Sequence, residues 1–192
     1  MNLTMLRRVT VAGLVLVLCG GYVAAQDPDP LIATWVLNVR KSNFSPGPGP
    51  QAETCTYTLE TQQTKVTSRT SEPRTYLSVG QEIRATSITV DGDGTLTTAE
   101  WTIVYDGRDR PIAGDVDADM LSVRRVDRYL KEFTKKRAGR TVITGTYAIS
   151  TDGTVMTVTS TGRNARGQAI KDVAVFDKQQ TLRSDPKLTP VR

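Results

Sequence analysis

Apolar and polar residues alternate with a period of two along most of the chain. In LIATWVLNV, residues 31–39, one face carries Trp35 and Leu37; in TVITGTYAIS, residues 141–150, one face carries Tyr147 and Ile149. This period predicts β-strands with one buried face, and the abundant threonine and valine suit such strands. No segment predicts a helix of ordinary length.

Turn signals separate these alternating segments at short intervals. They are DGDG at 91–94, YDGRDRP at 105–111, STDGT at 150–154 and NARGQ at 164–168. Asp-Gly between alternating segments is a strong hairpin signal. We count nine or ten strands between residues 31 and 177, a spacing typical of an antiparallel barrel or sandwich. SPGPGP at 45–50 cannot form a regular ladder and predicts an ordered loop or lid.

The first 25 residues have the features of an export signal. Arg7 and Arg8 precede an apolar run at 9–18, and small residues follow at 23–25. We expect cleavage after residue 25, a barrel domain over 26–180 without a transmembrane segment, and a loose tail over 181–192. The protein would then be exported, to the periplasm or beyond the cell. A lipid anchor on Cys19 is the alternative, which Leu18 disfavours because a small residue is wanted there.

The opening strand and later segments resemble a family of secreted bacterial proteins. The similar segments are LIATWVLNVRKSNFSPGP, YDGRDRPIAGDVDADMLSVRRVD, DGTVMTVTSTGRNARGQ and VAVFDKQ. The opening is also similar to the Gly-x-Trp start of lipocalins and fatty-acid-binding proteins, with Ala33 in place of the glycine. The resemblance implies a lipocalin-like (calycin-type) barrel in which Trp35 closes one end beneath a basic side chain. The candidates for that side chain are Arg124, Arg125 and Arg163. Together with the turn spacing, it leads us to predict an all-β fold: a single antiparallel up-and-down barrel of about 8–10 strands.

Composition removes several kinds of chemistry. The chain has no histidine, so Ser-His-Asp and Cys-His catalysis and histidine metal ligation are excluded. No glycine-rich phosphate loop precedes a helix. We therefore predict neither an enzyme nor a cofactor, although a carboxylate or tyrosine mechanism stays open. The net charge is +5, and the densest basic segment, KKRAGR at 135–140, lacks interleaved aromatic residues. We interpret it as a hairpin turn and predict no nucleic-acid binding.

Two smaller features have a structural and a chemical interpretation. Asp115, Asp117 and Asp119 alternate like part of a calcium loop, but the glycine and final glutamate of an EF-hand are missing. An exposed loop with Asx-turns is the preferred interpretation, and a weak calcium site is the alternative. Cys55 alternates with Tyr57 and Leu59, which favours a buried apolar residue over a reactive thiol.

The barrel interior offers a place for a small hydrophobic or amphipathic ligand. Arg125 shares a face with Leu121 and Val123, where it could neutralise a carboxylate, or it lies at the strand end and reaches water. The candidate ligand-binding residues are Arg125, Trp101, Tyr105 and Tyr147. The alternative is a barrel filled by its own side chains, acting as a structural or protein-interaction module of the periplasm or cell envelope. The sequence leaves the oligomeric state open.

Overall fold

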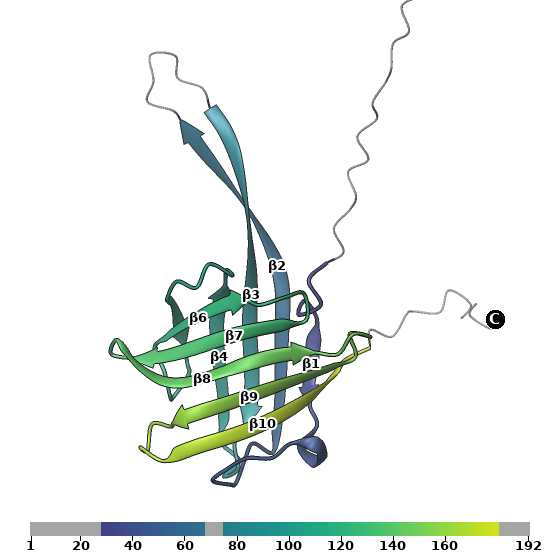
Figure 1. Cartoon of the computed structure of the whole chain (residues 1–192), viewed down its shortest axis with the longest axis vertical. Coiled ribbons are helices and arrows are strands. Elements are labelled where there is room, and N and C mark those ends of the chain that lie inside the picture. The colour runs from purple at the N-terminus through teal and green to yellow at the C-terminus, as the bar shows by residue number, and fades with distance from the viewer. Residues whose placement is uncertain (1–27, 68–74, 181–192) are drawn as a thin grey trace, which may run out of the picture.

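The computed structural model describes residues 28–67 and 75–180, which form one closed antiparallel barrel of ten strands (Figure 1). The predicted signal peptide and the tail at 181–192 lie outside the described residues. The strands are β1 (Thr34–Leu37), β2 (Ala52–Thr67), β3 (Thr75–Val90), β4 (Leu96–Ile103), β5 (Arg110–Ala113), β6 (Met120–Arg125), β7 (Leu130–Arg137), β8 (Arg140–Ile149), β9 (Val155–Arg163) and β10 (Ala169–Lys178). A single 3-10 turn, η1 (Val39–Lys41), follows β1.

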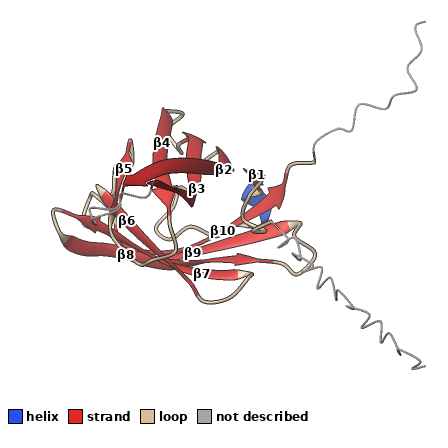
Figure 2. Cartoon of the chain, turned by 90° about the horizontal axis from the view of Figure 1, so that it is seen from above, coloured by secondary structure: helices blue, strands red, loops and turns tan. Residues whose placement is uncertain are grey.

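Each strand pairs with its neighbour in sequence, and the short strand β1 closes the barrel. Trp35 pairs with Cys55 of β2 on one side and with Lys178 of β10 on the other. The ring of strands is visible from above in Figure 2. The predicted fold class, a single antiparallel up-and-down barrel of about 8–10 strands, is confirmed. Within the described part of the chain, no helix has the length and hydropathy that a membrane crossing requires.

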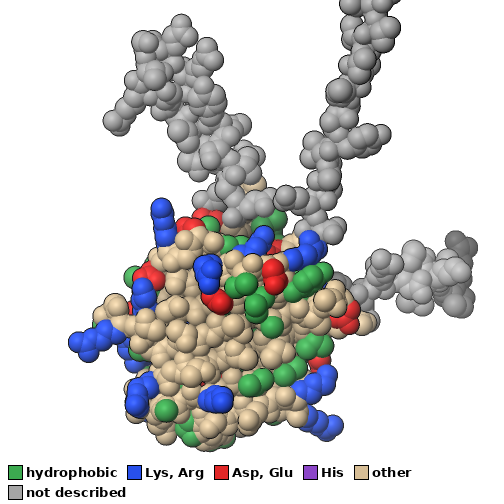
Figure 3. Space-filling model, viewed as in Figure 1, with side chains coloured by type: hydrophobic (Ala, Val, Ile, Leu, Met, Phe, Trp, Pro, Cys, Tyr) green, Lys and Arg blue, Asp and Glu red, His purple; other side chains and the backbone are tan. Residues whose placement is uncertain are grey.

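Local turn chemistry explains the hairpins. The basic segment at 135–140 contains the tight turn between β7 and β8, as predicted, but the turn itself is only residues 138–139 and the first three residues of the segment belong to β7. Ala138 and Gly139 occupy its two central positions with φ of 47° and 76°. Both angles are left-handed, which is what the favoured two-residue hairpin turn requires. In Figure 3 the Lys and Arg side chains are scattered over the visible face among neutral ones.

The strand directions define two ends of the barrel. We call the end with the loops at 42–51, 91–95, 114–119 and 164–168 the mouth. We call the other end, with the loops at 104–109, 126–129 and 150–154 and the segment at 28–33, the closed end.

Apolar side chains fill the interior at the closed end. Trp35 and Leu31 are fully buried there, and the Trp35 indole Nε1 donates a hydrogen bond to the Leu31 carbonyl oxygen at 3.0 Å. The basic group above the Trp35 ring is Lys178, whose Nζ lies 5.8 Å from the ring centroid. The three arginine candidates named above do not take this place. β10 closes onto β1, and this pairing brings Lys178 to the tryptophan.

β2 and β3 continue past the closed end as a two-stranded ribbon (Figure 1). β3 pairs with β4 only as far as Ile83, whereas its pairing with β2 continues to Thr75. Leu59 lies where the ribbon leaves the barrel, and 45% of its surface is exposed. The alternation in β2 therefore predicts burial correctly for Cys55 and Tyr57 but not for Leu59.

Candidate ligand-binding site

A cavity of about 260 Å³ occupies the mouth half of the barrel interior. Its walls are inward-facing side chains from nearly every strand, so it exists only because the sheet closes. Small-molecule sites are typically concave, mostly apolar and furnished with a few convergent polar groups. The barrel is therefore filled at its closed end and hollow towards its mouth.

Aromatic rings form a shelf across the bottom of this cavity. Tyr57 contacts Trp101 edge-on with ring centroids 6.1 Å apart, and Tyr147 edge-on at 6.5 Å. Phe133 continues the shelf at 4.8 Å from Tyr147. Edge-on and tilted contacts are favoured by the ring quadrupoles, and these contacts hold each ring in place. We refer to these four residues as the aromatic shelf.

Gly145 makes room for the shelf. A Cβ atom at this position would lie 1.9 Å from the Thr159 carbonyl oxygen and 2.5 Å from Cζ of Phe133. Gly145 pairs with Phe133 across β7 and β8, so the Phe133 ring lies over a residue that has no side chain. The shelf thus depends on one glycine in β8.

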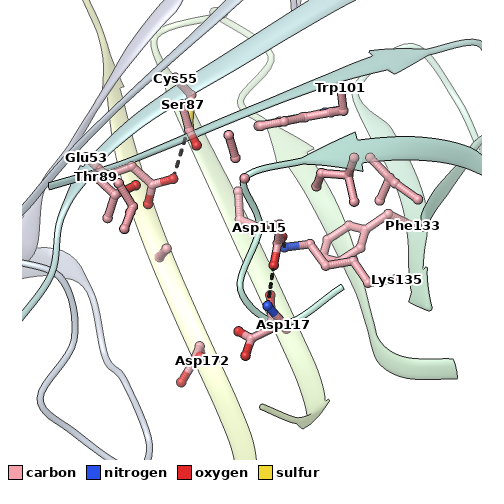
Figure 4. Close-up of a pocket in the computed structure, with 18 of the residues that line it drawn as sticks. Glu53, Cys55, Ser87, Thr89, Trp101, Asp115, Asp117, Phe133, Lys135 and Asp172 are labelled. Carbon is pink, nitrogen blue, oxygen red and sulfur yellow. Dashed lines mark hydrogen bonds and ion pairs between the residues drawn. The ribbon is translucent and has the colours of Figure 1, made fainter. Parts of the chain in front are cut away.

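Polar side chains line the cavity above the shelf. Lys135 of β7 forms an ion pair with Asp115 at 2.6 Å, and Asp115 also accepts hydrogen bonds from the backbone N–H groups of Asp117 and Ala118. Glu53 of β2 accepts a hydrogen bond from the Cys55 thiol at 3.3 Å. Figure 4 shows Glu53, Asp115, Asp117, Lys135 and Asp172 around the same opening.

The environment changes the acidity of several of these groups. Burial raises the pKa of Glu53, because an ionised carboxylate loses its water there, and the hydrogen bond from Cys55 and the charge of Lys135 only partly offset this effect. Burial likewise raises the pKa of Asp172, and the nearby charge of Asp117 raises it further. Burial and the adjacent Glu53 carboxylate raise the pKa of the Cys55 thiol well above its ordinary value. Cys55 is therefore an unreactive thiol in the cavity wall.

The Pro/Gly loop forms the outer rim of the site. A hollow of about 580 Å³ lies between this loop, the 91–95 turn and the 164–168 turn, and we call it the vestibule. It shares six lining residues with the cavity, so the two adjoin: Phe44, Asp91, Thr97, Val116, Asp117 and Asp172. Asp172 anchors the loop by accepting a hydrogen bond from the Ser45 backbone N–H at 2.8 Å. The predicted ordered loop thus lies at the entrance.

The four candidate ligand-binding residues divide into two pairs. Trp101 and Tyr147 line the cavity and belong to the shelf. Arg125 and Tyr105 lie at the closed end, where the Arg125 guanidinium stacks 4.3 Å above the Tyr105 ring. Both donate hydrogen bonds to Asp29, Arg125 at 2.5 Å and Tyr105 at 2.9 Å. Arg125 therefore lies at the strand end, which was the alternative to an inward position beside Leu121 and Val123.

Asp29 fastens the segment before β1 to the closed end. Its carboxylate also forms an ion pair with Lys131, whose side chain is fully buried, at 3.2 Å. Burial raises the pKa of Asp29, but the Leu31 N–H, the Lys131 charge and the Tyr105 hydroxyl lower it by more, so the pKa lies below its ordinary value. We call Asp29, Tyr105, Arg125 and Lys131 the Asp29 cluster; it joins three parts of the chain.

The acidic loop at 115–119 contains one Asx-turn, at Asp115, whereas Asp117 and Asp119 bind backbone N–H groups of other loops. Asp115 accepts from backbone N–H groups within the loop, Asp117 from the Ala165 N–H at 2.6 Å, and Asp119 from the Ala138 N–H at 2.9 Å. The three carboxylates have different partners. Within the described residues, no group of three or more acidic or thiol side chains gathers in a way that could hold a metal ion.

Several charged residues of the site were not among the sequence candidates, notably Glu53, Lys135 and Asp172. Each alternates with inward apolar residues on its strand, as Glu53 does with Cys55 and Tyr57. The signal that could have identified them is a charged residue at a position that alternates with buried apolar residues on the same strand. This signal is ambiguous near a strand end, where an inward-facing side chain can still reach water.

A scan of protein-family models and a search of curated proteins found no match to this chain. The fold and the cavity define its class as a closed antiparallel barrel with a hollow mouth half.

Proposed function

We propose that this chain is an exported binding protein that holds a small amphipathic molecule in the mouth half of its barrel. The observation that carries the proposal is the division of the interior. The closed end is packed, whereas the mouth half keeps about 260 Å³ free above an aromatic shelf. The apolar part of a ligand would contact the shelf, and its polar group would lie among the side chains of the mouth. The export part rests on the N-terminal sequence.

The cavity favours this function over a filled structural barrel. Side chains that only fill a core pack to a density that leaves few voids larger than a water molecule. Here charged groups such as Lys135 and Glu53 face an open interior, which gives a purely structural barrel no advantage. The dimensions favour a ligand of modest size, because 260 Å³ lies just below the usual range of small-molecule sites.

A substitution that fills the cavity tests the proposal. Ala99 lines the cavity on β4, and the neighbouring Thr98 is exposed. We expect Ala99→Phe to weaken binding of the neutral fluorescent probe N-phenyl-1-naphthylamine at least tenfold, because the new ring takes the ligand's volume. The measurement is fluorescence titration, with native mass spectrometry of protein from its own host to detect a retained small molecule.

The matched control is Thr98→Phe, which adds the same ring to the outer face of the same strand. It should leave probe binding unchanged. Equal probe binding by both variants, or no probe binding and a clean apo mass for the unmodified protein, would contradict the proposal and favour the structural module.

A further inference from the structure

The lining of the cavity in the mouth half is acidic although the chain as a whole is basic. The net charge is +5. Five acidic residues line the cavity, namely Glu53, Asp91, Asp115, Asp117 and Asp172, against one basic residue, Lys135. The vestibule adds Asp93 and Arg166, one of each sign. The charge of the site therefore has the opposite sign to that of the whole molecule.

The single cation of the cavity is already paired. Lys135 contacts Asp115 at 2.6 Å, and 25% of its side chain is exposed. For Glu53, Asp117 and Asp172 the donors are the Cys55 thiol and the backbone N–H groups of Ala165 and Ser45. Within residues 28–61 and 82–180, none of these three carboxylates forms an ion pair. All three residues are half-buried, and charged groups that lose part of their water are normally paired.

The aromatic shelf provides a surface for the less polar part of the same ligand. Aromatic side chains offer large areas for apolar contact. Trp101 and Tyr57 lie four residues deeper along their strands than Thr97 and Glu53, which is about 13 Å of strand. An organic ammonium ion of modest length would therefore meet carboxylates near the mouth and rings below.

An unpartnered donor marks the same cavity independently of the acidic residues. The indole Nε1 of Trp101 is buried and has no hydrogen-bond partner; among the side chains that the structure describes, it is the one such nitrogen or oxygen. Buried donors are nearly always satisfied, so one left without a partner in a cavity wall indicates an acceptor that a ligand supplies.

We infer that the ligand of this cavity is an organic ammonium compound: an amine whose cationic group is neutralised by Glu53 and Asp172. Its less polar part lies on the aromatic shelf and carries a hydrogen-bond acceptor for the Trp101 Nε1–H group. The inference rests on the proposed function and specifies the class of ligand. An anionic amphiphile such as a fatty acid would instead face unpaired carboxylates of its own sign.

Three probes that share a phenyl ring and differ in charge test the inference. They are 2-phenylethylamine, which is cationic at pH 7, the neutral 2-phenylethanol, and the anionic 3-phenylpropanoate. Isothermal titration of the full mature chain should give a dissociation constant at least tenfold lower for the amine than for the alcohol. The carboxylate should bind most weakly.

Charge-neutralising variants assign the effect to the site. Glu53→Gln and Asp172→Asn should each reduce the preference for the amine over the alcohol several-fold. Glu132→Gln is the matched control, because Glu132 lies on the outer wall and pairs with Arg124 at 2.6 Å. It should leave the preference unchanged, and a thermal melt of each variant verifies folding.

The outcomes separate this inference from the proposed function. Equal binding of amine and alcohol, or tighter binding of the carboxylate, overturns the cationic ligand and leaves a binding barrel. An amine preference that survives in both Glu53→Gln and Asp172→Asn also overturns it. If none of the three phenyl probes binds and N-phenyl-1-naphthylamine does not bind either, both the cationic ligand and the proposed binding function are overturned.

Discussion

At the scale of single residues, the Asp29 cluster illustrates how a few polar contacts fasten the chain end. The side chain of Asp29 is 9% exposed and that of Lys131 is fully buried, so water solvates neither charge well. Each of the two residues therefore neutralises the charge of the other. Removing one partner of such a pair leaves the other charge buried and uncompensated. Arg125 is half exposed, so removal of Asp29 costs it less free energy, because water can solvate its guanidinium in place of the carboxylate.

We predict that Asp29→Asn lowers the free energy of unfolding by about 3 kcal/mol at pH 7. The folded pKa of Asp29 lies below its ordinary value, so its ionised form stabilises the fold above that value. The contribution disappears as the pH falls through the lowered pKa. Urea denaturation across pH 3–7 should therefore show the two proteins converging in acid.

The control is Asp109→Asn, which removes the exposed ion pair with Lys136. It should cost less than about 1 kcal/mol at pH 7. A constant difference between Asp29→Asn and the unmodified protein at every pH would mean that the Asp29 charge is not what stabilises the closed end.

At the scale of elements, β8 determines whether the cavity has a shelf. Its inward face carries Ile143, Gly145 and Tyr147 in alternation, and the missing side chain at Gly145 admits the Phe133 ring from β7. Glycine in a strand interior costs conformational entropy, and it is found where another group approaches closely. Here that group is the Phe133 ring of the aromatic shelf.

We predict that Gly145→Ala destabilises the protein by about 1–3 kcal/mol, because the added methyl group overpacks against Phe133 and the Thr159 carbonyl oxygen. Displacement of the shelf should also weaken binding of N-phenyl-1-naphthylamine. Thermal denaturation and probe titration measure the two effects. The control is Thr144→Ala, at the exposed neighbouring position, which should change stability and probe affinity by much less. Unchanged stability in Gly145→Ala would contradict the close packing at this position.

At the scale of the whole molecule, the β2–β3 ribbon extends beyond the part of the sheet that closes the barrel. The pairing of β3 with β4 ends at Ile83, and the pairing of β2 with β1 ends at Tyr57. The hydrogen-bonded ring of the barrel therefore includes no residue of the ribbon beyond these two positions. Beyond that point the two strands pair only with each other. An isolated two-stranded ribbon adds little stability of its own.

We predict that replacing residues 62–80 with an Asn-Gly turn leaves the barrel folded. The pairs from Glu53↔Thr89 to Leu59↔Ile83 remain, and the favoured hairpin dipeptide closes the shortened strands. The urea midpoint and probe affinity should match those of the full chain. Loss of cooperative unfolding in the shortened chain would show that the ribbon contributes to the barrel.

Local pattern was sufficient for the elements and for the class of fold. The alternation around Trp35, Tyr147 and Ile149 correctly gives their buried faces, and the Asp-Gly and Ala-Gly turns correctly give the hairpins. Both signals act between residues that are close in sequence, because side-chain direction repeats every two residues and a turn needs only a few. Ten antiparallel strands joined by short turns then leave few topologies.

Contacts between distant residues decided the rest. Arg125 turns away from the interior because Asp29, 96 residues earlier, lies at the closed end. Lys178 covers Trp35 because β10 closes onto β1. The cavity is the volume that the inward-facing side chains of the strands leave free once the strands pair in their final register. The alternation within a single strand does not determine that volume. The sequence by itself determined a barrel with a buried Trp35, whereas tertiary structure alone decided that its mouth half is hollow and acidic.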